Sequence, residues 1–160
     1  DVGAYAGGYA IRAAKLYDKV IAIEPIPTYA NIIRINAELN NLNNIIVYEQ
    51  AVSDVEGEAN FYVKGLGQLS SLTPQQADKV IKVKVTTLEK IIDEIGEIPS
   101  LIKIDVEGAE LQVIKGLGKY RDKVKEIIVE SSEERIEEIL KMKKYKVVKH
   151  EGENYFLIHE

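Results

Sequence analysis

Residues 19–24, KVIAIE, form a short and almost continuous apolar run, the pattern of a strand that is covered on both faces of a sheet. Before them, residues 9–17 have a helical composition and follow two glycines. After them, Pro27 suits the first turn of a helix whose apolar residues extend to Leu39. Residues 45–49, IIVYE, then predict another strand. This alternation predicts a parallel sheet with right-handed crossovers.

The middle of the chain departs from this alternation. Residues 59–64 and 80–85 alternate between apolar and polar side chains in the manner of strands. The stretch between them, residues 65–78, is rich in Gly, Ser, Thr and Pro and reads as a long loop. Loops of this length in a compact domain are commonly functional. We therefore expect residues 58–86 to form a strand–loop–strand insertion near the active site.

The second half of the chain returns to helices and strands. Two spacings of Ser or Thr before Glu, at residues 86–89 and 131–134, resemble capping boxes and predict helix starts. The last two strands are separated by four residues and require a hairpin. The expected elements here are strands over 101–105, 126–130, 145–150 and 155–159 and a helix over 109–115. The fold class is α/β: one Rossmann-like domain over residues 1–160, mostly parallel, with a C-terminal antiparallel hairpin.

Length and charge limit the function. The 160-residue chain is 46% hydrophobic, which is enough for one domain with a sizeable core. Its 21 basic and 26 acidic residues give a net charge of -5, and the basic ones are spread along the chain. Nucleic-acid binding usually leaves a concentrated basic surface, so a small or neutral substrate is favoured instead. The sequence carries no signal for the oligomeric state.

The composition also indicates an environment. The chain has no cysteine, which excludes disulfides and thiolate metal sites and fits a reducing cytoplasm. Its longest apolar runs are of strand length, well short of the roughly 20 residues that a membrane helix needs. Ile, Lys and Glu are abundant, a composition that favours a thermophilic source. We expect a cytoplasmic protein without a membrane span.

The chain opens at Asp1, directly on a glycine-rich loop. In a doubly wound sheet an apolar strand precedes such a loop. We therefore expect the first strand to be missing from this sequence and the domain to be N-terminally truncated. A naturally processed terminus is the alternative.

The glycine-rich loop is the first candidate for ligand binding, because ligands of open α/β sheets bind beyond the carboxyl ends of the strands. Gly3 and Gly7 allow the backbone to approach a ligand closely. Tyr5 stands where a dinucleotide fingerprint has its second glycine, so close approach of a pyrophosphate is disfavoured. A tight strand-to-helix turn without a ligand is the alternative interpretation.

Two further candidates follow the next strands. Glu24 closes a strand some twenty residues after the loop, where a carboxylate can accept hydrogen bonds from both hydroxyls of a ribose. Ala51 follows the next strand, where small residues are suited to an adenine slot or to an ordinary turn. A solvated strand-end charge is the plain interpretation of Glu24 alone. Together with the glycine loop it indicates an adenosine-type ligand, either NAD or S-adenosylmethionine.

Three carboxylates crowd the turn after the strand at residues 101–105. Asp105 is expected at the end of this strand, Glu107 in the turn and Glu110 in the first turn of the next helix. Such a cluster needs something cationic to share, which a sulfonium ligand, its amino group, a proton or a metal would supply. Helix capping explains Glu107 and Glu110 equally well, but it explains Asp105 less well. A divalent metal is considered but not predicted, because no His accompanies the carboxylates.

These residues together resemble the motifs of the FkbM family of S-adenosylmethionine-dependent methyltransferases. The resemblance covers residues 1–130 and is strongest at KIDVEGAE, residues 103–110. It implies the class I methyltransferase fold, S-adenosylmethionine as methyl donor, and a hydroxyl group of a sugar or other small molecule as acceptor. It also implies that Asp1, Gly3 and Gly7 surround the methionine part, that Glu24 holds the ribose, and that Asp105 lies between cofactor and acceptor.

The expected function is therefore O-methyl transfer to a small molecule or carbohydrate. Asp105 is the expected residue that orients or deprotonates the acceptor, and Glu107 is the second candidate. The alternatives are an NAD-linked oxidoreductase and a non-catalytic module that binds an adenosine cofactor. Tyr5, the terminal hairpin and the Asp105 cluster count against the oxidoreductase.

Overall fold

A computed structural model describes residues 1–67, 69–74, 76–142 and 144–160. Gln68 and Gln75, which fall within the predicted loop 65–78, and Lys143 lie outside the described residues.

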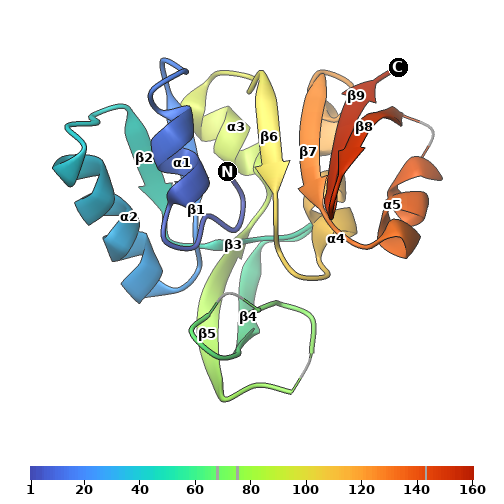
Figure 1. Ribbon diagram of the computed structural model, residues 1–160. Coiled ribbons are helices and arrows are strands. Elements are labelled where there is room, and N and C mark those ends of the chain that lie inside the picture. Colours follow the sequence, from blue (N-terminus) through green and yellow to red (C-terminus); the bar gives the residue numbers. More distant parts are fainter. Residues whose placement is uncertain (68, 75, 143) are drawn as a thin grey trace.

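Helices and strands alternate as the sequence predicts (Figure 1). In chain order they are α1 (Gly8–Ala13), β1 (Val20–Ile23), α2 (Pro27–Leu39), β2 (Ile45–Tyr48), β3 (Ala51–Val52), β4 (Gly57–Val63), β5 (Lys79–Thr86), α3 (Leu88–Ile95), β6 (Leu101–Ile104), α4 (Glu110–Lys115), the 3-10 helix η1 (Gly118–Tyr120), β7 (Glu126–Glu130), α5 (Glu133–Leu140), β8 (Tyr145–Glu151) and β9 (Asn154–His159).

Two parallel pairs of strands, β1 with β2 and β6 with β7, form the centre of the fold. Val2 joins them, because it makes parallel bridges to Ile23 of β1 and to Ile104 of β6. Its N–H donates to the carbonyl of Lys103 at 2.8 Å, and its carbonyl accepts from the N–H of Asp105 at 3.0 Å. These bonds fix the start of the glycine-rich loop beside the carboxyl ends of both strands.

The remaining strands lie outside this parallel centre. β9 pairs antiparallel with β7, and β8 pairs antiparallel with β9. β3, β5 and β4 form a separate sheet in that order, and its β4–β5 hairpin projects from the body of the molecule (Figure 1). We call residues 57–86 the β4–β5 arm. It corresponds to the strand–loop–strand segment that the sequence predicts.

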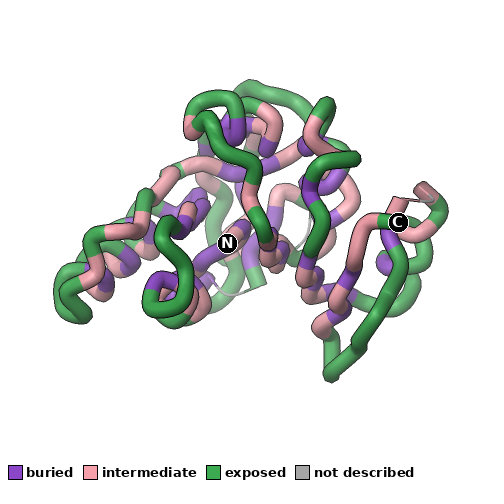
Figure 2. The backbone as a smooth tube through the Cα atoms, turned by 90° about the horizontal axis from the view of Figure 1, so that it is seen from above, coloured by how far each residue is buried: buried purple, intermediate pink, exposed green. Residues whose placement is uncertain are grey.

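Apolar packing holds the helices against the strands, and the buried stretches run through the middle of the molecule (Figure 2). The largest core cluster combines β6, β7 and β9 with residues from α3, α4 and α5, including Ile91, Ile114 and Ile139. A second cluster packs small residues of α1 against β1 and α2. A third, built around Phe61 and Val85, fastens the β4–β5 arm to the end of β1. Burial of each large aliphatic side chain is worth roughly 1.5–3 kcal/mol.

A slot lies between β1 and β6, on the amino-terminal side of Val2. It is a cavity of about 310 Å³ with an apolar lining that includes Ile21, Ile91 and Leu101. The α-ammonium group of Asp1 is buried at its end and donates to the carbonyl of Ile21 at 2.8 Å. The backbone edges of β1 and β6 face each other across the slot, which has room for a further segment that could hydrogen-bond to both.

Helix α1 is shorter than the sequence predicts, since it ends at Ala13 rather than near residue 17. The side chain of Asn44, far along the chain, donates to the carbonyl of Ala14 at 2.9 Å and to that of Tyr17 at 2.8 Å. These bonds satisfy carbonyl groups that a longer helix would have used for its own ladder. The chain turns instead and enters β1.

Both predicted capping boxes are wrong in detail. The N-cap of α3 is Thr87, one residue later than expected, and its side chain accepts from the N–H of Lys90. Glu89 instead accepts from the backbone N–H of Lys119 at 3.1 Å. The N-cap of α5 is Ser132, and its side chain makes no capping hydrogen bond.

This difference gives a matched pair of variants. Thr87→Ala is expected to lower the free energy of unfolding by about 1 kcal/mol, because it removes the acceptor for an otherwise unpaired helix N–H. Ser132→Ala, at an exposed N-cap without that bond, is expected to change it by less than about 0.5 kcal/mol. Urea denaturation measures both values. Equal losses in the two variants would contradict the capping role of Thr87.

No helix among the described residues has the length and apolar character needed to cross a membrane.

Candidate active site

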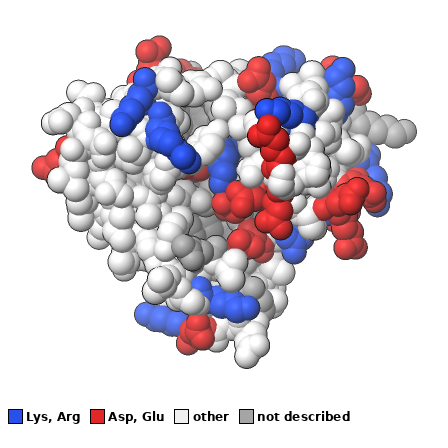
Figure 3. Space-filling model, in the orientation of Figure 1, with Lys and Arg blue, Asp and Glu red and all other residues white. Residues whose placement is uncertain are grey.

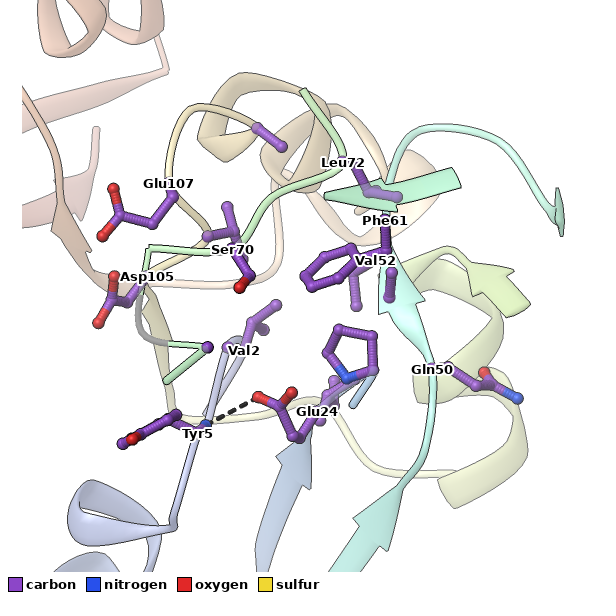
Figure 4. Close-up of a pocket in the computed structure, with 17 residues that line it drawn as sticks. Val2, Tyr5, Glu24, Gln50, Val52, Phe61, Ser70, Leu72, Asp105 and Glu107 are labelled. Atoms are coloured by element: carbon purple, nitrogen blue, oxygen red, sulfur yellow. Dashed lines mark hydrogen bonds between the residues drawn. The ribbon is translucent and has the colours of Figure 1, made fainter. Parts of the chain in front are cut away.

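A pocket lies beyond the carboxyl ends of β1 and β6 and beside β3, and the β4–β5 arm covers one side of it (Figure 4). The predicted site residues that line it are Gly3, Glu24, Ala51, Asp105 and Glu107. Asp1 lines the slot instead, and its buried carboxylate has no hydrogen-bond partner among the described residues. Gly7 is the N-cap of α1, and a Cβ there would lie 3.1 Å from the side chain of Ile33. The roles of Asp1 and Gly7 toward the methionine part stay predictions.

Glu24 sits at one end of the pocket in a fixed orientation. Its Oε2 accepts from the N–H of Tyr5 and its Oε1 from the N–H of Ile26, both at 2.9 Å. The residue is only 5% exposed. Burial raises the pKa of this carboxyl to about 7, although the two backbone hydrogen bonds act in the opposite direction. The carboxylate is therefore held by backbone groups while its remaining lone pairs are available to a ligand.

The glycine loop touches the carboxylate strand directly at Gly3. Gly3 has a φ of 79°, and a Cβ built on it would lie 1.8 Å from the carbonyl oxygen of Asp105. The loop needs this approach because Val2 is hydrogen-bonded to the same segment. Glycine is therefore required here for space as well as for conformation.

Gly3→Ala is expected to cost more than about 3 kcal/mol of unfolding free energy, since the backbone of either loop must move. Gly96→Ala is the matched control, because Gly96 has a φ of 74° and no atom would lie within 4 Å of its new Cβ. It is expected to cost only about 1 kcal/mol, from left-handed strain. Chemical denaturation of both variants separates the clash from the strain, and a Gly3→Ala loss no larger than the Gly96→Ala loss would argue against the close approach.

Aromatic side chains border the Glu24 end of the pocket. The rings of Tyr5 and Tyr29 lie 4.3 Å apart between centroids. Gly67 of the β4–β5 arm packs so closely on Tyr29 that a Cβ at this position would lie 2.4 Å from the ring. The sequence gives no signal for this contact, because the residues involved come from three separate loops or helices.

The opposite end of the pocket is acidic. The Nζ of Lys103 lies 2.8 Å from Oδ2 of Asp105 and 3.8 Å from Oε2 of Glu130. Lys103 is largely buried, with 10% of its side chain exposed. Asp105 follows β6 and Glu130 ends β7, so the parallel pairing of these strands brings the two carboxylates to one lysine. Asp105 thus has a fixed position and a counter-ion.

None of the described residues forms a salt bridge with Glu107. Burial and then the neighbouring carboxylates of Asp105, Glu110 and Glu130 raise its pKa, whereas the charge of Arg135 lowers it. Figure 3 shows acidic side chains gathered over the end of β6 and β7 on this face. Figure 4 shows the carboxylates of Asp105 and Glu107 on the same side of the pocket. A carboxyl with a raised pKa beside a pocket is suited to accepting a proton.

The placement of the carboxylates also bears on metal binding. Among the described residues, no group of three or more His, Cys, Asp or Glu side chains is placed to hold a metal ion.

The pocket can therefore bind a polar group through Glu24 at one end and position a proton acceptor at the other. It also offers apolar surface from Ala51, Val52 and Phe61. Sequence reasoning missed Phe61 and Lys103. Lys103 stands two residues before Asp105 in the strand that the sequence predicts over 101–105, a spacing that places both side chains on the same face and could have revealed the pair.

Comparison with protein-family models matches residues 1–149 to the methyltransferase FkbM domain. The chain belongs to the FkbM methyltransferase family. This confirms the resemblance found in the sequence. The matched family is one of methyltransferases rather than of NAD-linked oxidoreductases.

Two curated relatives are named as methyltransferases. Methyltransferase 1 from Beauveria bassiana (strain ARSEF 2860) is 24% identical, over 81% of this chain and 62% of the relative. Methyltransferase sdnD from Sordaria araneosa is 26% identical, over 83% of this chain and 65% of the relative. The chain therefore spans less than two thirds of the length of either relative.

Two solved structures share the fold. Methyltransferase FkbM from Methylobacillus flagellatus KT gives a TM-score of 0.65 at 18% identity, covering 100% of this chain and 42% of that one. Precorrin-6y C5,15-methyltransferase from Geobacter metallireducens GS-15 gives a TM-score of 0.56 at 17% identity, covering 99% of this chain and 75% of that one. The α/β fold of the FkbM domain is thus shared with known methyltransferases.

Proposed function

We propose that this domain transfers a methyl group from S-adenosylmethionine to a hydroxyl oxygen of a small molecule or carbohydrate. The observation that carries the proposal is the distribution of carboxylates in one pocket. Glu24, held by two backbone N–H groups, lies at one end, and Asp105 and Glu107 lie at the other. Such a pocket offers a carboxylate that can accept hydrogen bonds from ribose hydroxyls, a second group that can accept a proton, and apolar surface.

The residues present fit the methyl donor. The two oxygens of Glu24 are suited to accept hydrogen bonds from adjacent ribose hydroxyls, as in other adenosine sites. Ala51 and Phe61 supply apolar surface for the adenine base. The acidic end of the pocket favours a cation, and the donor carries a sulfonium charge. When bound, S-adenosylmethionine supplies the electrophilic methyl group.

Asp105 and Glu107 have different roles toward the hydroxyl group of the acceptor. Lys103 fixes the carboxylate of Asp105, which therefore orients the acceptor hydroxyl by accepting a hydrogen bond. Glu107 has a raised pKa and lines the pocket, so it takes the hydroxyl proton as the acceptor oxygen forms its new bond. Holding the hydroxyl in line is the larger contribution, because alignment can supply several kcal/mol of barrier reduction.

The slot between β1 and β6 supports a further part of this proposal. Residues 1–3 already pair with both strands, so a parallel strand running into Asp1 would complete a class I methyltransferase sheet. Its apolar lining suits a strand that is buried on both faces.

Calorimetric titration and a turnover assay test the proposed function. S-adenosylmethionine and S-adenosylhomocysteine are expected to bind, and NAD is not. A panel of sugar and alcohol acceptors incubated with methyl-labelled donor is expected to yield a labelled ether. Binding without transfer to any acceptor would favour the non-catalytic module, and absence of binding would reject the proposal.

A further inference from the structure

The β4–β5 arm is hydrogen-bonded to the turn that carries Glu107. The hydroxyl of Ser71 donates to the carbonyl of Val106, and the hydroxyl of Thr73 donates to the carbonyl of Gly108, each at 3.3 Å. These two carbonyls belong to the residues immediately before and after Glu107. The arm therefore holds the turn on both sides of the candidate proton acceptor.

The backbone of this turn needs such support. Glu107 has a φ of 52°, in the left-handed region that L side chains rarely adopt, and Gly108 follows with a φ of 104°. Conformations of this kind persist where the surrounding structure determines them, and they concentrate at functional sites. On the other side of the turn, Arg135 of α5 lies within 3.9 Å of Glu110. The turn is thus enclosed between α5 and the arm.

Ser71 is a rigid anchor for these contacts. It is 1% exposed, and its backbone exchanges two hydrogen bonds with Tyr62 of β4, at 2.9 and 3.1 Å. Its hydroxyl also accepts from the N–H of Thr73 at 3.0 Å, so the two hydroxyls are fixed relative to each other. The position of β4 is in this way transmitted to the Glu107 turn.

We propose that Ser71 and Thr73 are positioning residues that hold Glu107 in place for the acceptor and tie its placement to the β4–β5 arm. This rests on the proposed function, in which Glu107 accepts the hydroxyl proton. Their neighbours Ser70 and Leu72 line the pocket, so the same segment that contacts the pocket sets the geometry of the turn. An acceptor that fits against the arm is then met by a correctly placed carboxylate.

The test uses substitutions that remove one hydroxyl without changing shape. Thr73→Val is expected to lower kcat about 10-fold, because a small misplacement of a catalytic group is costly. The KM for S-adenosylmethionine should stay within about twofold, since the Glu24 end is untouched. Thr73→Ser, which keeps the hydroxyl, should retain at least half of the wild-type kcat. Thr28→Val, at an exposed threonine of α2, is the matched control and should be silent.

Two readouts separate positioning from general damage. The limb of the kcat–pH profile that reports Glu107 should shift in Thr73→Val and return in Thr73→Ser. Hydrogen exchange of the backbone in residues 105–110 should be faster in Thr73→Val and in Ser71→Ala than in wild type.

The outcomes distinguish this inference from the proposed function. A wild type that transfers no methyl group overturns the proposed function and, with it, a catalytic use for the turn. An active wild type with unchanged kcat, pH profile and exchange in Thr73→Val overturns the positioning role alone. Equal loss of kcat in Thr73→Val and Thr73→Ser would also overturn it, because the hydroxyl would then not be the cause.

Discussion

Glu107→Gln is expected to lower kcat for methyl transfer by about 10²- to 10⁴-fold, the usual contribution of a positioned proton acceptor. The amide keeps the size of the side chain but cannot take the hydroxyl proton. Because the pKa of Glu107 is raised above its ordinary value, wild-type kcat should increase as the pH rises through that pKa, and this limb should vanish in the variant. Affinity for S-adenosylmethionine, measured by calorimetry, should change by less than about twofold.

Two further variants sharpen the result. Glu153→Gln removes a charge that acts on Glu130, in a residue outside the pocket lining, and should leave kcat nearly unchanged. Asp105→Asn should lower kcat because it weakens both the pairing with Lys103 and the hydrogen bond to the acceptor. Full turnover in Asp105→Asn with unchanged cofactor affinity would remove Asp105 from the mechanism. Full turnover in Glu107→Gln would show that Glu107 is not the proton acceptor and would leave Asp105 as the candidate.

Glu24→Gln is expected to weaken S-adenosylmethionine binding by on the order of 100-fold. Hydrogen bonds to a charged group are worth about 1.5–3 kcal/mol each, and the substitution replaces a charged acceptor of two ribose hydroxyls by a neutral amide with one acceptor oxygen. Binding to wild type should strengthen as the pH rises through about 7, because the ionised carboxylate is the better acceptor. Calorimetry at pH 6 and pH 8 measures this, and the variant should show no such pH dependence.

The same carboxyl should affect stability in the opposite direction. Folding raises its pKa from the ordinary value of 4.5 to about 7, so the fold favours the neutral form. Its contribution to stability is complete below pH 4.5 and is lost as the pH rises to about 7, a change of roughly 3 kcal/mol. Urea denaturation of wild type and Glu24→Gln at pH 5 and pH 8 measures this contribution of Glu24 to the free energy of unfolding. An identical pH dependence in the two proteins would contradict the buried, perturbed carboxyl.

The order of helices and strands was predictable because it follows from local apolar periodicity. The run at residues 19–24 becomes β1, and Pro27 begins α2 as expected. The position of Glu24 in the pocket was also predictable, because carboxyl ends of parallel strands meet at one edge of the sheet. These inferences depend only on residues close together in the chain.

What the sequence could not predict depends on residues far apart. The side chain of Asn44 hydrogen-bonds to the carbonyl of Ala14 at the end of α1, 30 residues earlier in the chain. The backbone N–H of Lys119 donates to Glu89, 30 residues earlier, so this carboxylate does not cap α3 as expected. The bond from Ser71 to Val106 spans 35 residues, and neither residue carries a local pattern that indicates the other. Polar side chains have many partners of equal chemistry, so only the folded backbone selects among them.

The contact between Gly3 and the carbonyl of Asp105 has a consequence for how such a domain can diversify. Because the glycine-rich loop and the segment that ends β6 are in van der Waals contact, a shift of either one to suit a new ligand disturbs the other. The described part of the β4–β5 arm meets the pocket from another side and is tied to the turn after β6 through the hydroxyls of Ser71 and Thr73. Changes in acceptor range should therefore accumulate at arm positions other than these two, while the loop and the strand evolve together as one unit.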